Sequence, residues 1–190
     1  MGTETKKAHV RRAAADYFNK YLVGFGIDIG CADDVLEICH GNVRLWDYEL
    51  GDGDAELMAI IPDDTYDFVY SSHCLEHVRH PEIAIQNWWR ILKPEGILFV
   101  VVPDEDLYEQ GFWPSKYNGG HISTWTIKKA KSWSPVSRNV VDMIDLLPNC
   151  LPLSIQRVDT GYDYELAGRS KKDQSDVAEV GIEFIFRKVA

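Results

Sequence analysis

Residues 26–34 have the sequence Gly-Ile-Asp-Ile-Gly-Cys-Ala-Asp-Asp, in which a short apolar run carries an acid and then turns on a glycine. A small residue at Gly30 lets the backbone approach a ligand closely, and amides that follow it at a helix start can donate to a carboxylate. Asp28 is suited to ordering this loop and to meeting an ammonium group. This combination of residues favours a site for a nucleotide-like cofactor.

Two further acidic positions follow this turn. Asp47 ends a second apolar run and follows the glycine at about 20 residues, the usual distance of the acid that binds ribose hydroxyls in nucleotide sites. Asp54 and Ala55 can offer a carboxylate and a backbone amide to the edge of an adenine ring. Each acid also has a purely structural explanation, because Asp28 could cap a helix, Asp47 could begin a turn and Asp54 could be a solvated loop acid. Their order and spacing together favour the cofactor site.

The remaining residues suited to chemistry are histidines. His73 and His77 flank Glu76 after a third apolar run, and His121 lies in the aromatic-rich segment 104–135. Histidine titrates near neutral pH, so His121 is the leading candidate for a general base, with His77 and His73 as further catalytic candidates. A loop histidine that hydrogen-bonds to the backbone explains His121 equally well, and His77 could serve to order its loop. We expect the segment 104–135 to form a lid over an acceptor pocket.

These residues lie at the ends of segments with the periodicity of strands and helices. The run at 97–102 is continuously apolar, as expected for a central parallel strand that is covered on both faces. The alternation of strands and helices predicts an open, largely parallel α/β sheet that binds ligands beyond the carboxyl ends of its strands. The predicted strands are residues 25–29, 43–46, 56–60, 66–71, 97–102, 154–159 and 181–189, and the predicted helices are residues 6–22, 34–39, 81–92 and 137–147.

Composition limits the class of protein. At 190 residues the chain suits a single domain, residues 1–190, with an N-terminal helix within residues 1–23. Hydrophobic residues make up 45% of the chain, which excludes a disordered protein, and no apolar run approaches the roughly 20 residues that cross a bilayer. The net charge of −10 disfavours a nucleic-acid partner, because such proteins need a basic face. We expect a small-molecule partner, no nucleic acid and no membrane insertion.

The cysteines and the N-terminus indicate the compartment. Cysteines at positions 31, 39, 74 and 150 form no Cys-x-x-Cys pair, and the first seven residues lack the apolar core of a signal peptide. Both features predict a cytoplasmic protein. His73, Cys74 and His77 resemble a metal cluster, but no second ligand set has the spacing of a zinc site, so we expect no metal. The sequence does not fix the oligomeric state and is compatible with a homodimer.

Three stretches of the chain together resemble a known superfamily. Residues 26–31, residues 66–78 (Tyr-Asp-Phe-Val-Tyr-Ser-Ser-His-Cys-Leu-Glu-His-Val) and residues 90–98 are similar to the first, fourth-strand and fifth-strand motifs of class I S-adenosylmethionine (SAM) dependent methyltransferases. The resemblance is strong over residues 25–103 and favours the branch whose members often methylate small molecules, sugars or lipid precursors. It implies a three-layer α/β/α domain with a mostly parallel, seven-stranded sheet, whose antiparallel last strand is inserted beside the fifth.

The resemblance also implies a cofactor and its contacts. SAM would be the methyl donor and S-adenosylhomocysteine (SAH) the product. A nicotinamide enzyme fits poorly, because the turn lacks the three spaced glycines that hold a pyrophosphate. The implied cofactor-binding residues are Asp28, Gly30, Cys31, Asp47, Asp54, Ala55, Ser71, Ser72 and His73.

We predict SAM-dependent methyl transfer to a hydroxyl or amine of a small molecule, with transfer to oxygen or nitrogen undecided. The alternative is a non-catalytic, methyltransferase-like binding or regulatory module. Its basis is the cofactor loop, where Ala32 and Asp34 stand at positions that the superfamily usually fills with glycines. The same fold can serve either role, and only release of the demethylated product with an acceptor distinguishes them.

Overall fold

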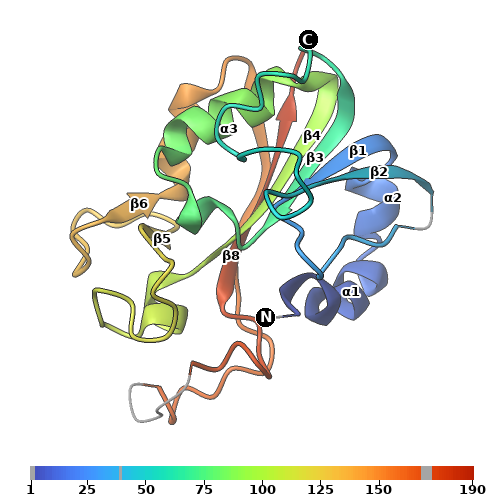
Figure 1. Ribbon diagram of the computed structural model, residues 1–190. Coiled ribbons are helices and arrows are strands. Elements are labelled where there is room, and N and C mark those ends of the chain that lie inside the picture. The colour runs from blue at the N-terminus through green and yellow to red at the C-terminus, as the bar shows by residue number, and fades with distance from the viewer. Residues whose placement is uncertain (1–2, 39, 168–172) are drawn as a thin grey trace.

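Figure 1 shows the computed structural model of the chain, which describes residues 3–38, 40–167 and 173–190. The strands of its main sheet are β1 (Gly24–Ile29), β2 (Gly41–Trp46), β3 (Tyr66–Ser72), β4 (Leu92–Pro103), β7 (Cys150–Val158) and β8 (Gly181–Lys188). They lie in the order β2-β1-β3-β4-β8-β7. The first four are mutually parallel, and β8 runs antiparallel between β4 and β7. The predicted α/β class, with a mostly parallel sheet and an antiparallel C-terminal strand, is confirmed.

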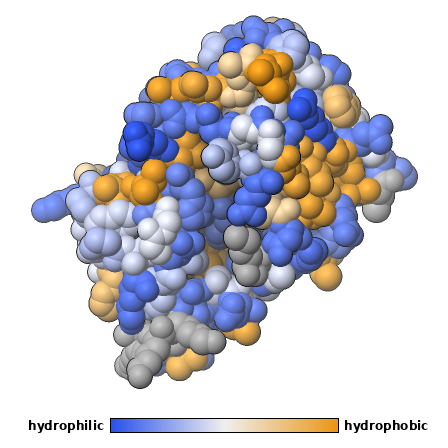
Figure 2. Space-filling view, viewed as in Figure 1, coloured by the Kyte–Doolittle hydropathy of each residue, from blue (hydrophilic) through white to orange (hydrophobic). Residues whose placement is uncertain are grey.

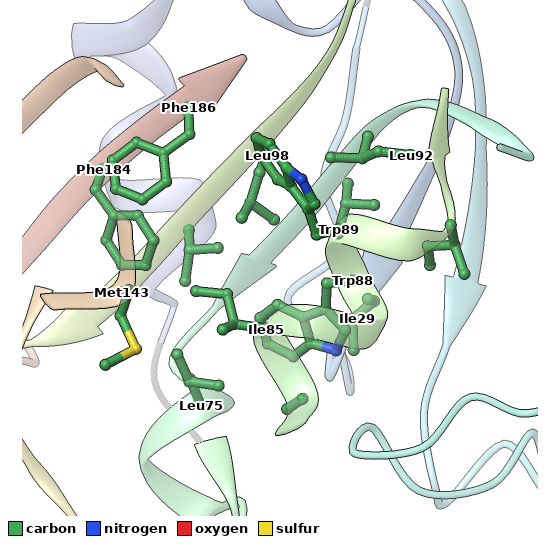
Figure 3. Close-up of a cluster of buried hydrophobic side chains, with 14 of the residues drawn as sticks. Ile29, Leu75, Ile85, Trp88, Trp89, Leu92, Leu98, Met143, Phe184 and Phe186 are labelled. Carbon is green, nitrogen blue, oxygen red and sulfur yellow. The ribbon is translucent and has the colours of Figure 1, made fainter. Parts of the chain in front are cut away.

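One face of the sheet is covered by α3 (Pro81–Arg90) and by the 3-10 helix η3 (Val140–Leu146). Ile85, Trp88 and Trp89 of α3 form a buried stripe in the larger of the hydrophobic clusters, and Figure 3 shows them beside the sheet. Apolar residues at this spacing share one side of a helix, so α3 buries its stripe and exposes the rest. The helix predicted at residues 81–92 is confirmed and ends at Arg90.

The other face is covered by α1 (Glu4–Ala14) and α2 (Tyr17–Tyr21), which lie on the side of the sheet away from α3 in Figure 1. Phe18 of α2 is buried against Phe99 and its neighbours in the second cluster. Asp16 takes a left-handed conformation, with φ 60°, and divides the helix predicted at residues 6–22 into two. With helices on both faces, the molecule has the three-layer α/β/α architecture. Among the described residues, no helix is long and apolar enough to span a membrane.

In the described part of the chain the main sheet has six strands rather than the seven predicted. The strand predicted at residues 56–60 does not form. The Asp54 carboxylate accepts hydrogen bonds from the amides of Glu56 and Leu57, which turns the chain at this point. Met58 then adopts φ 46°, a conformation that a strand cannot contain. Met58 is nevertheless buried, so its apolar character comes from the core and not from a strand.

The helix predicted at residues 34–39 is also wrong over its described part, residues 34–38, and Cys39 lies outside the described residues. Polar contacts with distant residues replace helical hydrogen bonds here. The amide of Leu36 donates to the Asp28 carboxylate at 2.7 Å, and the Asp34 carboxylate accepts from the amide of Thr5 at 2.6 Å. The loop is therefore tied to β1 and to the start of α1.

The helix predicted at residues 137–147 is replaced by two shorter elements. β6 (Ser137–Asn139) pairs in parallel with β5 (Thr124–Thr126) as a separate two-stranded sheet, and η3 follows it. Val140 and Met143 of η3 are still buried in the core, because a 3-10 helix also places residues three apart on one side. The apolar spacing predicted the buried face correctly but not the type of helix.

Candidate cofactor and acceptor site

A cavity of about 570 Å³ opens beyond the carboxyl ends of the parallel strands. Its wall includes Asp28 near the end of β1, Gly30 directly after β1, Asp47 after β2 and Ser72 at the end of β3. Parallel sheets bind ligands at this edge. In the space-filling view the middle of the molecule is largely hydrophilic, with more hydrophobic areas on either side (Figure 2). The strand-end acids predicted from the sequence therefore do meet in one cavity.

Gly30 is held closely against the loop that follows β3. It adopts φ 74°, and a Cβ atom added there would lie 2.5 Å from both Cβ and Sγ of Cys74. Any side chain would also be strained at this backbone conformation. Cys31, which follows, is buried and lines the same cavity. The turn therefore requires glycine for two reasons, its conformation and its packing.

Asp28 and Asp47 both order the cofactor loop through backbone amides. Asp28 is buried and accepts from Leu36, and burial raises the pKa of its carboxyl to about 7. Asp47 accepts from the amides of Ala32 at 3.0 Å and Glu49 at 2.9 Å. Ala32 takes φ 44°, so it adopts the left-handed conformation that glycine would favour. For both acids, the structural role and a place in the cavity wall are compatible.

Asp54 and Ala55 line a neighbouring cavity of about 520 Å³ and not the first one. Tyr48 and His77 line both cavities, so they mark the boundary between the two. An aromatic residue directly after the strand-end acid was the available signal for Tyr48, which the sequence analysis did not select. The carbonyl of Ala55 accepts from the ring N–H of Trp88 at 2.8 Å, which fixes this loop to α3.

The serines and histidine after β3 have different surroundings. Ser71 lines neither cavity, and its hydroxyl donates to the carbonyl of Ile29 at 2.9 Å, so its role is to join β3 to β1. Ser72 lines the first cavity, and its buried hydroxyl oxygen has no hydrogen-bond partner within the described residues. His73 also lines that cavity, with φ 54°, and burial lowers its pKa to about 3. His73 is therefore neutral at physiological pH and a weak base.

The far end of the first cavity holds a compact cluster of ionisable side chains. Nδ1 of His121 lies 2.6 Å from Oε1 of Glu109, and Nδ1 of His77 lies 2.8 Å from the carbonyl oxygen of Gly120. The two histidine rings are 4.9 Å apart, edge to face. Nε2 of each ring lies 3.9 Å from Oε1 of Glu76, which is fully buried. The predicted histidines His77 and His121 thus come together around one carboxylate.

Some residues in and beside the cavity wall were not singled out from the sequence. Glu4 and Thr5 line the first cavity from the start of α1. Tyr108, from the segment 104–135, also lines it, with its ring centroid 4.8 Å from that of His121. Glu109 belongs to η2 (Glu105–Glu109), a short π-helical turn that follows β4. Nothing in the spacing of the sequence marks Glu109, because its pairing with His121 depends on how the chain folds after β4.

The fold and the strand-end site define the class of protein, and the comparisons agree with them. The family model described as a methyltransferase domain matches residues 7–134, which is more than half of the chain. The chain belongs to this methyltransferase family, and S-adenosylmethionine is the cofactor of the family. A search of curated proteins found no match.

Several solved structures share the fold at low sequence identity. A complex of the Trm112 methyltransferase activator and a putative methyltransferase from Haloferax volcanii matches at 12% identity and a TM-score of 0.58, over 98% of this chain and 94% of that one. The YcgJ protein of Bacillus subtilis matches at 12% identity and 0.56, over 95% and 99%. A putative SAM-dependent methyltransferase from Listeria monocytogenes matches at 15% and 0.54, over 87% and 90%. Each of these likenesses is evidence of a shared fold.

Proposed function

We propose that this protein transfers the methyl group of SAM to a hydroxyl or amine of a small molecule. The observation that carries the proposal is the first cavity, which is lined at one end by Gly30 and Asp47 and at the other by His77, Tyr108 and His121. Methyl transfer needs a donor and an acceptor held together, and one continuous cavity provides room for both. Its volume of about 570 Å³ lies within the usual range for small-molecule sites.

The residues of the cofactor end suit SAM. Gly30 lines the first cavity without a side chain, and the Ser72 hydroxyl, which has no hydrogen-bond partner within the described residues, can bind the amino-acid part. The Asp47 carboxylate is suited to the ribose hydroxyls, and Tyr48, with the loop at Asp54 and Ala55, would border the adenine in the second cavity. Acidic residues around the cavity favour a ligand that carries an ammonium and a sulfonium.

Bound SAM would supply a methyl group attached to a sulfonium. The acceptor atom would form a bond to the methyl carbon while the bond from that carbon to sulfur breaks and its electron pair stays on sulfur. His121 is the proposed acceptor of the displaced proton. Glu109 holds Nδ1 of its ring, so the lone pair of Nε2 is left for the acceptor's hydroxyl or amine. Tyr108 packs beside the ring and restricts its orientation. The segment 104–135, which supplies these residues, is proposed to cover the bound acceptor.

The cofactor loop favours catalysis over the non-catalytic alternative. Ala32 stands where the superfamily usually has glycine, yet it adopts φ 44° and donates its amide to Asp47. The loop therefore keeps the bend that the substitution put in question. Asp34, at the second departure, is used to fasten α1 through the amide of Thr5 and does not block the turn.

A turnover screen tests the proposal. Purified protein is incubated with SAM and a library of hydroxyl and amine compounds, and SAH release is measured against a reaction without acceptor. Release that depends on at least one acceptor supports the proposal. Tight binding of SAH with no release from any acceptor class would favour the binding module instead.

A further inference from the structure

We propose that Glu76, His77 and His121 form a binding site for a divalent transition-metal cation at the acceptor end of the cavity. This inference rests on the proposed function, because it names the group that would bind the acceptor. It also departs from the expectation of no metal, which considered only His73, Cys74 and His77. The fold adds His121, which lies far along the chain, to the Glu-His pair after β3.

The hydrogen bonds of the two histidines set both rings for metal binding. The carbonyl oxygen of Gly120 can only accept, so Nδ1 of His77 carries the hydrogen. The Glu109 carboxylate accepts from Nδ1 of His121 in the same way. Each ring therefore turns a bare Nε2 toward Oε1 of Glu76, at 3.9 Å in both cases. Metal-binding histidines are usually held like this, with the other ring nitrogen donating to a carboxylate or a carbonyl.

The surroundings of the Glu76 carboxylate give a separate reason to expect a cation. Glu76 is fully buried, and neither of its carboxylate oxygens has a hydrogen-bond partner within the described residues. A buried carboxylate that is charged and has no partner is strongly unfavourable unless it takes up a proton or a positive charge compensates it. A cation between Glu76 and the two Nε2 atoms would provide that charge, and it would also balance the nearby Glu109.

The spacing of the three groups fits a cation after a small adjustment. One ligand atom from each residue lies within 4.8 Å of the others. Ligands about 2.0–2.2 Å from a shared cation lie roughly 3.0–3.5 Å from each other. The two 3.9 Å separations from Oε1 of Glu76 must therefore shorten by less than about 1 Å, and the separation between the two histidine nitrogens, which is at most 4.8 Å, by up to about 1.8 Å. Two imidazoles and one carboxylate suit zinc, iron or manganese, and three protein ligands leave positions free for a further ligand.

A cation at this site would define the class of acceptor. A hydroxyl that binds a divalent cation loses its proton more readily and keeps lone pairs for attack. An amine would use its only lone pair to bind the cation, so the site favours an oxygen acceptor. Nε2 of His121 would then be a ligand, and the acceptor's proton would pass to water. The same lone pair thus serves either as the proton acceptor or as a cation ligand.

Cobalt titration of the chelator-treated, full-length protein tests the site. Co²⁺ bound by protein side chains absorbs visible light in a way that depends on its ligands, so the readout does not depend on activity. We expect one equivalent of Co²⁺ to bind saturably and to be displaced by Zn²⁺. His77→Ala changes an exposed side chain and should preserve the fold, and it should weaken binding by about 10-fold or more, as should Glu76→Gln.

His80→Ala is the matched control, because His80 also pairs with a carboxylate, Glu56, at 2.7 Å but lies outside the cluster. It should leave Co²⁺ affinity unchanged. No binding by the wild-type protein, or equal binding by wild type and His77→Ala, would overturn the inference. SAH titration of the same samples separates the two proposals. SAH binding without Co²⁺ binding would contradict only the proposed metal site. Co²⁺ binding without SAH binding would contradict the proposed function.

Discussion

The two ends of the first cavity treat their carboxylates differently. At the cofactor end, Asp28 and Asp47 accept hydrogen bonds from backbone amides of nearby loops. At the acceptor end, both oxygens of Glu76 and Oε2 of Glu109 are buried without a hydrogen-bond partner in the part of the chain that the structure describes. The chain itself satisfies the carboxylates of the first end, whereas those of the second end are arranged for groups that a ligand must supply.

Their origins in the sequence differ in the same way. The cofactor end is built from one continuous part of the chain, in the loops after β1, β2 and β3. The acceptor end joins the residues after β3 with Tyr108, Asn118 and His121 from a segment with little regular structure. Parallel strands fix the position of the loops that directly follow them, which is why the cofactor end could be placed from the order of the strands.

The largest expected effect is at the turn of the cofactor end. Gly30→Val would place a side chain against Cys74 at a strained φ of 74°, so we expect SAH affinity to fall by about 100-fold or more. Calorimetric titration measures the loss, and circular dichroism confirms that the variant is folded. Gly119→Val is the control, because a Cβ there meets nothing within 4 Å. Equal SAH affinity in Gly30→Val and wild type would show that the ligand does not approach this turn.

The acceptor end should respond in rate and not in cofactor affinity. We expect His121→Ala to lower kcat by about 100-fold, because it removes the Nε2 lone pair that activates the acceptor either as its proton acceptor or as a cation ligand, and to leave SAH affinity unchanged. The measurement is SAH release with a screened acceptor, with His9→Ala as a control outside the cavity wall. A kcat equal to that of wild type would show that His121 takes no part in the chemistry and that the two ends do not differ in function as proposed.

A smaller effect should follow at the second strand end. Asp47→Ala removes a charged acceptor for ribose hydroxyls, which corresponds to a loss of about 10-fold in SAH affinity. Asp33→Ala removes the same charge from an exposed position of the same cavity and serves as the control. If the two variants lose SAH affinity equally, Asp47 contributes only through the negative charge of the cavity, and the proposed contact between Asp47 and the ribose is wrong.

The smallest effect concerns stability and pH. The pKa of Asp28 is raised by burial from 3.8 to about 7, with Asp34 and Asp47 raising it further and Arg12 opposing them. A raised folded-state pKa gives stability that is complete below pH 3.8 and is lost as the pH rises through about 7. Between about pH 6 and pH 8, wild type should therefore lose about 1 kcal/mol more than Asp28→Asn.

Urea unfolding at each pH measures this difference, with Asp33→Asn as the exposed control. If wild type and Asp28→Asn show the same pH dependence of the free energy of unfolding, then Asp28 is charged throughout this range. The backbone amides of the cofactor end would then satisfy its carboxylates less completely than the comparison of the two ends implies.

The elements that position the cofactor were predictable from the sequence. The continuous apolar run at residues 97–102 of β4 is buried, so its composition alone marks it as a central strand, and most residues of β1 and β3 are buried as well. Because Gly30 directly follows β1 and Asp47 directly follows β2, both could be placed at the same edge before the fold was known. The stripe on α3 was equally plain, since a single helical face carries it.

The loops and the acceptor end were less predictable because distant contacts decide them. The apolar side chain of Met58 is buried in the core, which accounts for the apolar pattern at residues 56–60. Its positive φ prevents the strand that this pattern predicts. Residues 34–38 remain irregular because Asp28 and Thr5, both remote in sequence, take part in their hydrogen bonds. Glu109 meets His121 only after a π-helical turn follows β4, and no local pattern encodes that meeting.

Calorimetric titration of the wild-type protein with SAH tests the central claim most directly. The account predicts saturable binding of one SAH per chain with an affinity in the micromolar range, because the loop at Gly30 and Asp47 is already in the conformation that the ligand needs. An absence of binding would contradict it, and would mean that the strand-end acids serve only to order the loops that they contact.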